Sequence, residues 1–312
     1  MSEPPYRLVD LGDRRVLTVG GVEHATGYSE RVIRMLIERK GARRAPLYFP
    51  FKTSRGRHFL DPLFQCLRGR GARDLSVLEV GCSFGHMTEY LAEQPEVAGI
   101  VTFDTDPAFV AIVRTKVEDL GLGKVREVAL LGNDETRRLP YAGGAFDLVV
   151  VTGVIEHLPV RNRRAQVDEY YRVLAPGGHI VILDTPNRLF PFETHSIGLP
   201  LVQWLPPGLA YRYARLCRPR RFRDVSIAGF TRDGTGWRNA TFRDCLPSSG
   251  WVGLEDLTEA AGYGWAFFRA TARSRRRRAL LPLFAVLVGA LRAFGRAPSL
   301  ALPYYNLLFR KR

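Results

Sequence analysis

Cysteine is scarce in this sequence, and the few cysteines form no pattern. The 312 residues include four, with no CxxC pair and no spacing typical of zinc ligands: Cys66, Cys82, Cys217 and Cys245. This usage argues against a disulfide framework and against a cysteine zinc site. We therefore expect a reducing compartment, and the cytoplasm is the predicted location.

Long apolar runs are also missing. The first 15 residues mix acids and prolines without an apolar segment, so no secretory signal is expected. The apolar segment 279–291 has 13 residues, fewer than the roughly 18 that a transmembrane helix needs. The sequence thus predicts no membrane-spanning helix.

Acidic residues are few relative to basic ones. The 31 Asp and Glu residues oppose 46 Lys and Arg residues, which gives a formal net charge of +15. Such an excess favours association with a polyanion, whether nucleic acid, anionic lipid or a phosphorylated substrate. Charge alone does not choose among these, and an arginine-rich composition that raises the charge of every surface explains the excess equally well.

The rest of the composition is that of an ordinary globular protein, with 46% hydrophobic and 25% charged residues. The length suits one large α/β domain with additions. We predict four parts: an N-terminal cap 1–72, a core 73–186, an insertion 187–253 and a C-terminal completion of the core 254–312. Two helix-like stretches, 28–40 and 57–70, make the cap a helical one.

The core alternates short Val-, Ile- and Leu-rich runs with helical segments. The predicted strands are 76–80, 99–103, 125–130, 146–151 and 179–183. This alternation is typical of parallel strands joined by crossover helices. The predicted fold class is therefore α/β and Rossmann-like, with helices on both faces of a mostly parallel sheet.

The insertion 187–253 is too long for an ordinary connection and is rich in aromatics, proline and arginine. An aromatic-rich insertion after the fifth strand suits a lid over a bulky apolar or sugar-bearing ligand. After it we predict a helix at 254–262, a strand at 265–271 and a last edge strand at 304–311.

A basic cluster and an apolar segment stand side by side near the end of the chain. Residues 273–278 hold five arginines in six positions and lead into the segment 279–291. The positions that share one face of a helix are Leu280, Phe284, Leu287, Leu291 and Phe294. Two interpretations stay open: residues 273–312 bind an anionic membrane surface through an interfacial helix, or that helix packs on the domain.

A glycine turn follows the first core strand. Gly81 permits a tight turn at the strand end, and Gly85 at the start of the next helix lets backbone approach a ligand at the helix N-terminus. Asp104 ends the next strand, at the separation at which an acidic residue meets a ribose hydroxyl in dinucleotide-type folds.

Around these residues the sequence resembles the class I methyltransferases, in particular the group that includes the ubiquinone- and menaquinone-biosynthesis enzymes. Five segments carry the resemblance, in the family's order: 77–85, 103–107, 133–141, 146–158 and 171–181. The resemblance implies the class I fold with a mostly parallel seven-stranded sheet, S-adenosylmethionine as cofactor and methyl transfer as the activity. An NAD-binding Rossmann domain would lack the later segments.

The resemblance also implies roles for individual residues. The cofactor-binding positions that it implies are Glu79, Gly81, Cys82, Ser83, Gly85, Asp104, Asp134, Glu135, Thr152 and Val154. The turn would hold the methionine moiety with Glu79 at its ammonium group, and Asp104 would accept both ribose hydroxyls. Asp134, with Glu135 behind it, would address the adenine, and Thr152 and Val154 would lie near the sulfonium. Ser83 stands where many relatives have glycine.

Two histidines are candidate general bases for a hydroxyl acceptor. His157 follows the fourth core strand and His195 the fifth, where the carboxyl ends of parallel strands gather. Each could instead be a structural loop residue, and Glu193 could orient either. Some ubiquinone-pathway relatives hold a divalent metal with an earlier Glu plus the Glu-His pair; because Gly153 stands at that earlier position, we predict no metal.

The leading functional hypothesis is O-methylation of a lipid, quinone-like or lipid-linked glycan substrate at the cytoplasmic membrane face. A soluble methyltransferase of small secondary metabolites follows if the C-terminal helix packs on the core. From another class, an RNA-binding protein or RNA methyltransferase would use the positive charge. The sequence has no recognised RNA-binding module and lacks the Asn/Asp-Pro-Pro-Tyr motif of amino-group methylases, so nucleic acid is not the expected partner. A non-catalytic cofactor-binding scaffold stays open.

Overall fold

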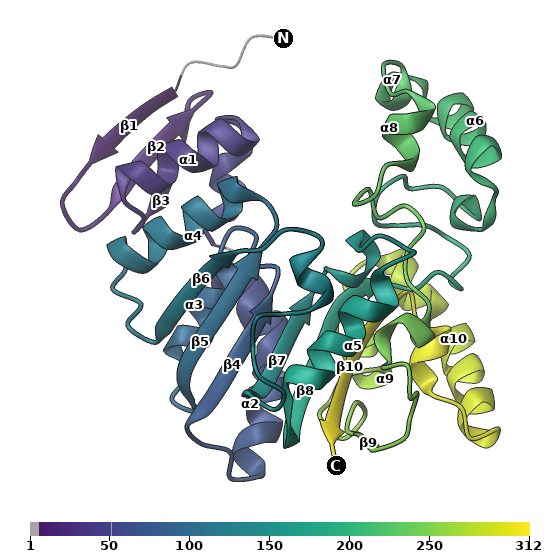
Figure 1. The fold of residues 1–312 in the computed structure, drawn as a ribbon. Coiled ribbons are helices and arrows are strands. Elements are labelled where there is room, and N and C mark those ends of the chain that lie inside the picture. Colours follow the sequence, from purple (N-terminus) through teal and green to yellow (C-terminus); the bar gives the residue numbers. More distant parts are fainter. Residues whose placement is uncertain (1–5, 51) are drawn as a thin grey trace. The chain divides into compact units, whose positions relative to one another are not determined.

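The computed structural model describes residues 6–50 and 52–312, and the chain divides into two compact units, one ending at Asn133 and one beginning at Asp134. The first unit runs from purple to blue-teal in Figure 1 and the second from teal to yellow. The division into four parts stays a prediction.

The first unit begins with a three-stranded antiparallel sheet that the sequence analysis did not predict. Its strands are β1 (Tyr6–Asp10), β2 (Arg15–Val19) and β3 (Val22–Thr26), paired in that order. Gly20 and Gly21 join β2 to β3 with φ of +58° and +82°, both in the left-handed region that a tight hairpin turn requires. The N-terminal region is therefore not purely helical.

The two helices predicted for this region are confirmed. They are α1 (Glu30–Lys40) and α2 (Arg57–Gly69), with a 3-10 helix (Ala45–Tyr48) and a π-helix (Lys52–Gly56) between them. The Ser29 hydroxyl caps α1 by accepting a hydrogen bond from the backbone of Val32. The apolar face of α1 packs with Leu17 of β2 in one buried cluster.

Three parallel strands form the centre of the first unit: β4 (Leu75–Val80), β5 (Val97–Asp104) and β6 (Val125–Leu130). They are joined by α3 (His86–Glu93) and α4 (Pro107–Asp119). The buried residues of these strands are mostly Val, Ile and Leu, which is the pattern of strands covered on both faces. The strands predicted at 76–80, 99–103 and 125–130 are thus confirmed.

The second unit continues the same architecture. Parallel strands β7 (Phe146–Thr152) and β8 (Leu174–Pro186) are joined by α5 (Arg163–Val173). Strand β10 (Tyr304–Lys311) pairs antiparallel with β8, and β9 (Leu254–Asp256) pairs antiparallel with β10. The seven strands form one mostly parallel sheet in the order β6-β5-β4-β7-β8-β10-β9. This order confirms the Rossmann-like α/β fold predicted from the sequence.

The segment predicted as an insertion, 187–253, leaves the end of β8 and returns to it at Ala240. Ala240 donates to the carbonyl of Pro186 at 2.9 Å, and Arg188 donates to the carbonyl of Ala240 at 2.7 Å. Between these points lie a 3-10 helix (Val202–Trp204), α6 (Pro207–Cys217), α7 (Pro219–Phe222) and α8 (Ile227–Thr231), and a further 3-10 helix (Phe242–Cys245) follows. Figure 1 shows α6, α7 and α8 grouped together. They share a small apolar core that includes Phe222, Phe230 and Trp237.

Two predictions for the C-terminal part are wrong. The predicted helix 254–262 begins instead with strand β9, because its residues pair with the last strand. The predicted strand 265–271 is α9 (Trp265–Ala270), whose aromatic side chains pack against the helix that follows. The edge strand predicted at 304–311 is confirmed as β10.

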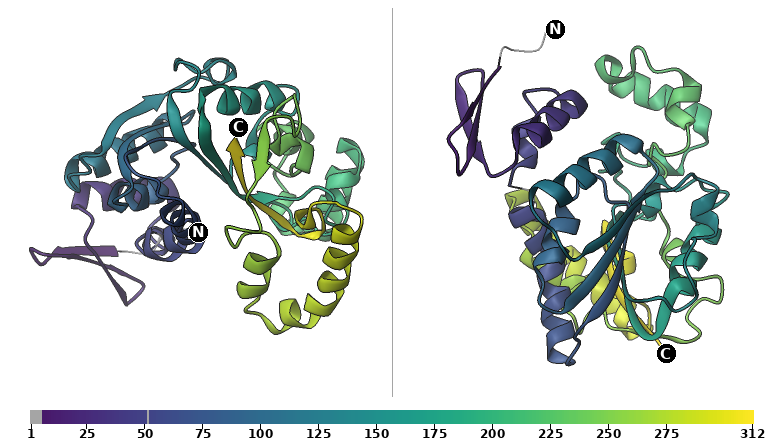
Figure 2. Two further views of the ribbon diagram at one scale, coloured as in Figure 1. Left: turned by 90° about the horizontal axis from the view of Figure 1, so that it is seen from below. Right: turned by 60° about the vertical axis from the view of Figure 1, so that its left-hand side comes forward.

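The apolar segment after the arginine cluster lies in α10 (Arg275–Ala293), which is followed by a 3-10 helix (Pro298–Ala301). In the left view of Figure 2, α9 and α10 follow one another along an arc at the lower edge, in yellow-green and yellow. Phe284 and Val288 are buried in a cluster with Trp265 and Phe268. Other apolar residues of this region are exposed: Leu280, Leu283, Val286, Leu287 and Phe294. Within residues 6–50 and 52–312, no helix combines the length and hydropathy needed to cross a membrane.

Candidate functional site

The glycine turn of the first unit has the backbone geometry that the sequence predicted. Gly81 and Gly85 adopt φ of +76° and +75°, in the left-handed region. A Cβ at Gly85 would lie 3.0 Å from Cγ2 of Val113, so α4 also requires the absence of a side chain there. Ser83 has φ of +46°. The turn therefore does accommodate a Cβ at the position where many relatives have glycine.

Asp104 holds this turn. Its Oδ2 accepts a hydrogen bond of 2.9 Å from the backbone amide of Ser83, and its Oδ1 accepts one of 3.0 Å from the amide of Asp106. A carboxylate oxygen can accept more than one hydrogen bond, so the carboxylate retains capacity for hydroxyl donors. The ribose role expected of Asp104 stays a prediction.

The other amides expected to face the cofactor also bond within the turn. Gly81 and Cys82 both donate to the carbonyl of Phe103 at 3.0 Å, and Gly85 donates to the carbonyl of Cys82 at 2.8 Å. The Cys82 thiol is buried, and burial raises its pKa, so it is not a reactive thiolate. These residues shape the turn, and contacts of theirs with a cofactor stay predictions.

Glu79 is a buried carboxylate near the end of β4, with 3% of its surface exposed. Thr88 of α3 donates its hydroxyl hydrogen to Oε2 of Glu79 at 2.6 Å. Burial raises the pKa of Glu79 to about 7, because the ionised form loses hydration. A cationic ligand beside this carboxylate would favour its ionised form.

The remaining predicted cofactor residues lie in the second unit. The side chain of Asp134 is 91% exposed and pairs with Arg137 at 3.2 Å, and Glu135 beside it is exposed too. Thr152 ends β7, and Val154 precedes the 3-10 helix Ile155–His157. The hydroxyl oxygen of Thr152 is buried and has no hydrogen-bond partner among the described residues.

The structure brings the two candidate bases together, although 38 positions separate them in the sequence. Nε2 of His157 lies 3.1 Å from Nε2 of His195. Oε1 of Glu156 lies 3.8 Å from the first of these nitrogens and 3.7 Å from the second. The Glu156 side chain is fully buried, whereas 40% of His157 and 26% of His195 are exposed.

The backbone of the insertion fixes the two rings. Nδ1 of His157 lies 2.7 Å from the carbonyl oxygen of Gly234. Since a carbonyl only accepts, Nδ1 carries the hydrogen and Nε2 keeps its lone pair. Burial lowers the pKa of His157, which favours this neutral ring. A Cβ at Gly236 would lie 3.0 Å from Cε1 of His157 and 3.2 Å from Cδ2 of His195, so both rings pack on bare backbone.

Glu193 shapes the loop that carries His195. It is fully buried, and its carboxylate accepts hydrogen bonds from four successive backbone amides. The donors are His195 at 2.8 Å, Ser196 at 2.7 Å, Ile197 at 2.6 Å and Gly198 at 2.9 Å. Glu193 thus positions the His195 loop through its backbone.

Arg163 does the same for the loop of Glu156 and His157, and the sequence analysis missed it. Its guanidinium, 4% exposed, donates to the carbonyls of Glu156 at 3.1 Å and Leu158 at 3.3 Å. It also donates to the carbonyl of Asn239 at 3.0 Å and pairs with Asp244 at 3.3 Å. Nothing distinguished Arg163 from the other arginines in the sequence, because only its burial reveals the role.

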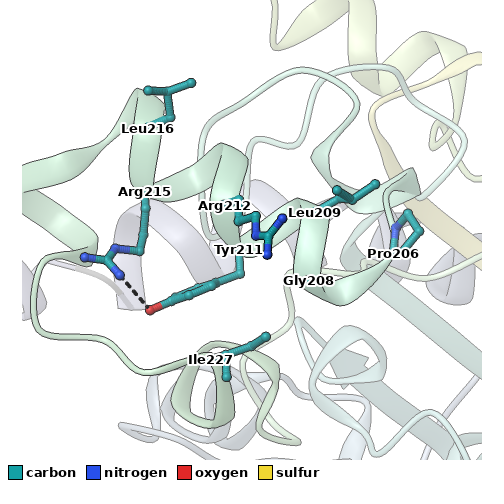
Figure 3. Close-up of a pocket in the computed structure, with 8 residues that line it drawn as sticks. All are labelled: Pro206, Gly208, Leu209, Tyr211, Arg212, Arg215, Leu216 and Ile227. Atoms are coloured by element: carbon teal, nitrogen blue, oxygen red, sulfur yellow. Dashed lines mark hydrogen bonds between the residues drawn. The ribbon is translucent and has the colours of Figure 1, made fainter.

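A groove of about 860 Å³ runs along α6 and α8 in the insertion (Figure 3). Its lining is apolar with two arginines: Pro206, Gly208, Leu209, Tyr211, Arg212, Arg215, Leu216 and Ile227. Arg215 donates to the Tyr211 hydroxyl at 3.4 Å, as drawn in Figure 3, and that hydroxyl donates to the carbonyl of Val225 at 2.8 Å. The groove combines apolar surface with positive charge.

Comparison with known proteins places a family match over the centre of the chain. Residues 77–178 match the family described as "Methyltransferase domain". A demethylmenaquinone methyltransferase of Thermus thermophilus is 34% identical over 110 residues, which are 35% of this chain and 47% of that protein. A ubiquinone biosynthesis O-methyltransferase of Azorhizobium caulinodans is 29% identical over 168 residues, 52% of this chain and 60% of that protein.

A solved structure of an S-adenosylmethionine-dependent methyltransferase from Aquifex aeolicus is 22% identical, covers 51% of this chain and 80% of its own, and has a TM-score of 0.35. That likeness is too small to bear on function. The chain spans about half the length of the curated relatives that it matches.

Proposed function

We propose that the chain transfers the methyl group of S-adenosylmethionine to a hydroxyl oxygen of an apolar, membrane-held acceptor. The premise is that residues 77–178 are a class I S-adenosylmethionine-dependent methyltransferase domain. The family match confirms the methyltransferase domain and the cofactor predicted from the sequence. The observation that carries the proposal is the turn Gly81–Gly85 closed by Asp104, which lies within the matched residues 77–178.

The buried polar groups at the strand ends support cofactor binding. Glu79 keeps a carboxylate inside the first unit, where the ammonium group of the cofactor would stabilise its charge. Thr152 holds a buried hydroxyl without a partner in residues 6–50 and 52–312, and such a group is expected to meet a ligand.

The pair His157 and His195 acts on the acceptor in this proposal. In the reaction the bond from the methyl carbon to sulfur breaks and its electron pair stays on sulfur. A new bond forms from the acceptor oxygen to the methyl carbon, and the hydroxyl loses its proton. Assistance with that proton is worth about 10²–10⁴-fold in rate. The neutral His157 ring, held by Gly234, is prepared for this task.

The groove and the names of two relatives support an apolar, lipid-like acceptor. The groove of α6 and α8 offers Leu209, Leu216 and Ile227 beside Arg212 and Arg215, which suits an apolar body with an anionic group. The names of the relatives above refer to menaquinone and ubiquinone, whose rings carry long apolar chains, and this agrees with such an acceptor.

The exposed side of α10 supports delivery from a membrane surface. Leu283 is 57% exposed, Val286 70% and Phe294 82%, and each would leave water on contact with lipid. Arginines at 273, 275, 277 and 278 are exposed at the start of this helix. Each basic residue near an anionic surface adds roughly 1 kcal/mol of attraction. The residues that pack α10 on the second unit, Phe284 and Val288, leave this side uncovered by the described residues.

Incubation with methyl-labelled cofactor and fractionated cell extract tests the acceptor class. We expect label in the organic-solvent fraction, as an ether stable to mild acid and base. Label in RNA, or in water-soluble small molecules alone, would contradict the lipid acceptor. Glu79→Gln combined with Asp104→Asn serves as the inactive control, because the proposal places both residues at the cofactor.

Vesicle flotation tests the membrane surface. We expect the chain to float with vesicles of anionic phospholipid and to remain below with neutral ones. The triple variant Leu283→Ser, Val286→Ser and Phe294→Ser should lose flotation, whereas Val22→Ser, an equally exposed apolar residue of the first unit (57%), should not. Flotation unchanged in the triple variant would exclude α10 as the docking helix.

A further inference from the structure

We propose that Glu156, His157 and His195 hold one divalent first-row metal ion. Their ligand atoms, Oε1 and two Nε2 atoms, form a triangle with sides of 3.1, 3.7 and 3.8 Å. Ligands that bind Zn²⁺ tetrahedrally at about 2.0–2.2 Å lie about 3.4 Å from one another. A single ion above this triangle would therefore reach all three atoms with small adjustments.

The chemistry of the three donors agrees with such an ion. Two imidazole nitrogens and one carboxylate oxygen suit zinc and its first-row neighbours better than magnesium or calcium, which prefer oxygen alone. The hydrogen bond from Nδ1 of His157 to the Gly234 carbonyl turns the Nε2 lone pair toward the cluster, as the outer partners of metal-binding histidines do. The carboxyl group of Glu156 is fully buried, and a cation beside it would stabilise its ionised form.

The third ligand explains why the sequence led to the opposite expectation. The prediction of no metal counted ligands only near the Glu-His pair, where Gly153 replaces an acid. Gly153 has φ of +62°, a conformation that an acidic side chain rarely adopts. His195 comes instead from the loop that Glu193 holds, 38 positions after His157.

This inference rests on the proposed function and narrows its acceptor. Three protein ligands leave a fourth position open, as in catalytic zinc sites. An acceptor hydroxyl bound there would lose its proton to water more readily, because the cation stabilises the oxyanion. With the ion bound, the two histidines are its ligands and no longer accept the proton directly, and the acceptor atom is oxygen.

The test is calorimetric titration of Zn²⁺ into the metal-stripped full chain, free of any affinity tag. Cys217 is an exposed thiol and would bind zinc on its own, so the measurements use a Cys217→Ser background. We expect one Zn²⁺ per chain, and Co²⁺ in its place should give the visible absorption of a low-coordinate nitrogen and oxygen site. His195→Ala and Glu156→Gln should each weaken Zn²⁺ binding at least about 10-fold, since loss of an outer partner alone costs about 10–100-fold. His24→Ala is the matched control and should bind as the parent does.

Absence of Zn²⁺ binding, or binding equally strong in His195→Ala and Glu156→Gln, would overturn the metal site. Thermal unfolding shows whether each variant is folded. If Glu156→Gln does not fold, the zinc affinities of His195→Ala and His195→Gln test the metal site, because the side chain of His195 is partly exposed. Titration of the same proteins with S-adenosylmethionine separates the two proposals. Cofactor binding without Zn²⁺ binding removes the metal and leaves the methyltransferase, whereas no cofactor binding in the parent removes the proposed function whatever zinc does.

Discussion

The backbone amide of Ser83 donates a hydrogen bond of 2.9 Å to the carboxylate of Asp104, so the end of β5 locks the turn that follows β4. The bond closes a loop between two parallel strands that are 21 positions apart at these residues. A ligand at the turn would meet the same carboxylate that fixes its shape. We therefore expect Asp104 to link the geometry of the turn to its affinity for the cofactor.

Replacement of Asp104 by Asn should lower the affinity for S-adenosylmethionine about 10- to 100-fold. The physical reason is the loss of charge-assisted hydrogen bonds, each worth about 1.5–3 kcal/mol. Calorimetric titration measures the change. Asp106→Asn is the control in the same loop, because Asn also caps α4. Wild-type affinity in Asp104→Asn would contradict a ribose contact.

Ser83 tests the left-handed conformation of the turn. A non-glycine residue there costs about 1–2 kcal/mol, and a β-branched one more. Ser83→Gly should leave the free energy of unfolding within about 0.5 kcal/mol, since relief of strain offsets the added flexibility of the unfolded chain. Ser83→Val should lower it by at least about 1 kcal/mol. Urea unfolding measures the free energy of unfolding of the parent and both variants. A Ser83→Val variant as stable as the parent would argue against φ of +46° at this position.

Glu79 should make stability depend on pH in the direction opposite to most carboxylates. Its pKa is raised by burial to about 7, above the value of 4.5 that it has in the unfolded chain. The folded state therefore binds more protons between these values, and stability falls as pH rises from about 4.5 to 7, by up to about 3 kcal/mol. Urea unfolding at pH 5 and 8 should show this loss in the parent, and Glu79→Gln should reduce it.

Cofactor binding should remove the proton from Glu79. An ammonium group beside it favours the carboxylate, so binding near pH 6.5 should release part of a proton. Calorimetry in buffers of different ionisation enthalpy measures this release. A release unchanged in Glu79→Gln would place the ammonium group elsewhere.

The central strands were predictable because burial on both faces leaves a local signature of Val, Ile and Leu. The hairpin of β2 and β3 also had a local signal, Gly20-Gly21 between two alternating runs, which the sequence analysis did not use. By contrast, β9 pairs with Phe309–Lys311 some 50 positions later, and α9 is helical although its aromatic residues favour strands. Tertiary packing determines both, so no local pattern reveals them.

The candidate site divides in the same way. The turn at Gly81 and Gly85 follows from glycine spacing, and His157 and His195 follow from their places after strands. The contact between His157 and His195 could not be predicted from the sequence, because it depends on a loop folded around the buried Glu193. A buried arginine that positions a loop, such as Arg163, cannot be told from a surface arginine in a sequence with 46 basic side chains.

A buried ion pair should govern the stability of the first unit. Lys116 of α4 and Glu89 of α3 pair at 2.7 Å with 1% and 2% of their side chains exposed, and Tyr28 donates its hydroxyl to Glu89 at 2.9 Å. Lys116→Met leaves a buried charge without its cation and should cost about 3–5 kcal/mol. The matched control is the exposed pair of Arg31 and Glu118, where Arg31→Met should cost at most about 1 kcal/mol. Urea unfolding measures both, and equal effects would show that burial does not decide.

Glu193 should control the His195 loop without touching the reacting groups. Its two oxygens accept four backbone amides, Oε1 from His195 and Ser196 and Oε2 from Ile197 and Gly198. An amide at this position presents N–H₂ to two of these donors, so Glu193→Gln should destabilise the loop by about 1–3 kcal/mol. Hydrogen exchange should accelerate at residues 195–198 and remain unchanged in β4 and β5. Glu255→Gln, which alters a partly exposed ion pair with Arg310, is the control. Because His195 moves with the loop, affinity for Zn²⁺ should fall about 10–100-fold in the same variant. Hydrogen exchange that stays slow at residues 195–198 in Glu193→Gln would show that the carboxylate does not hold the loop.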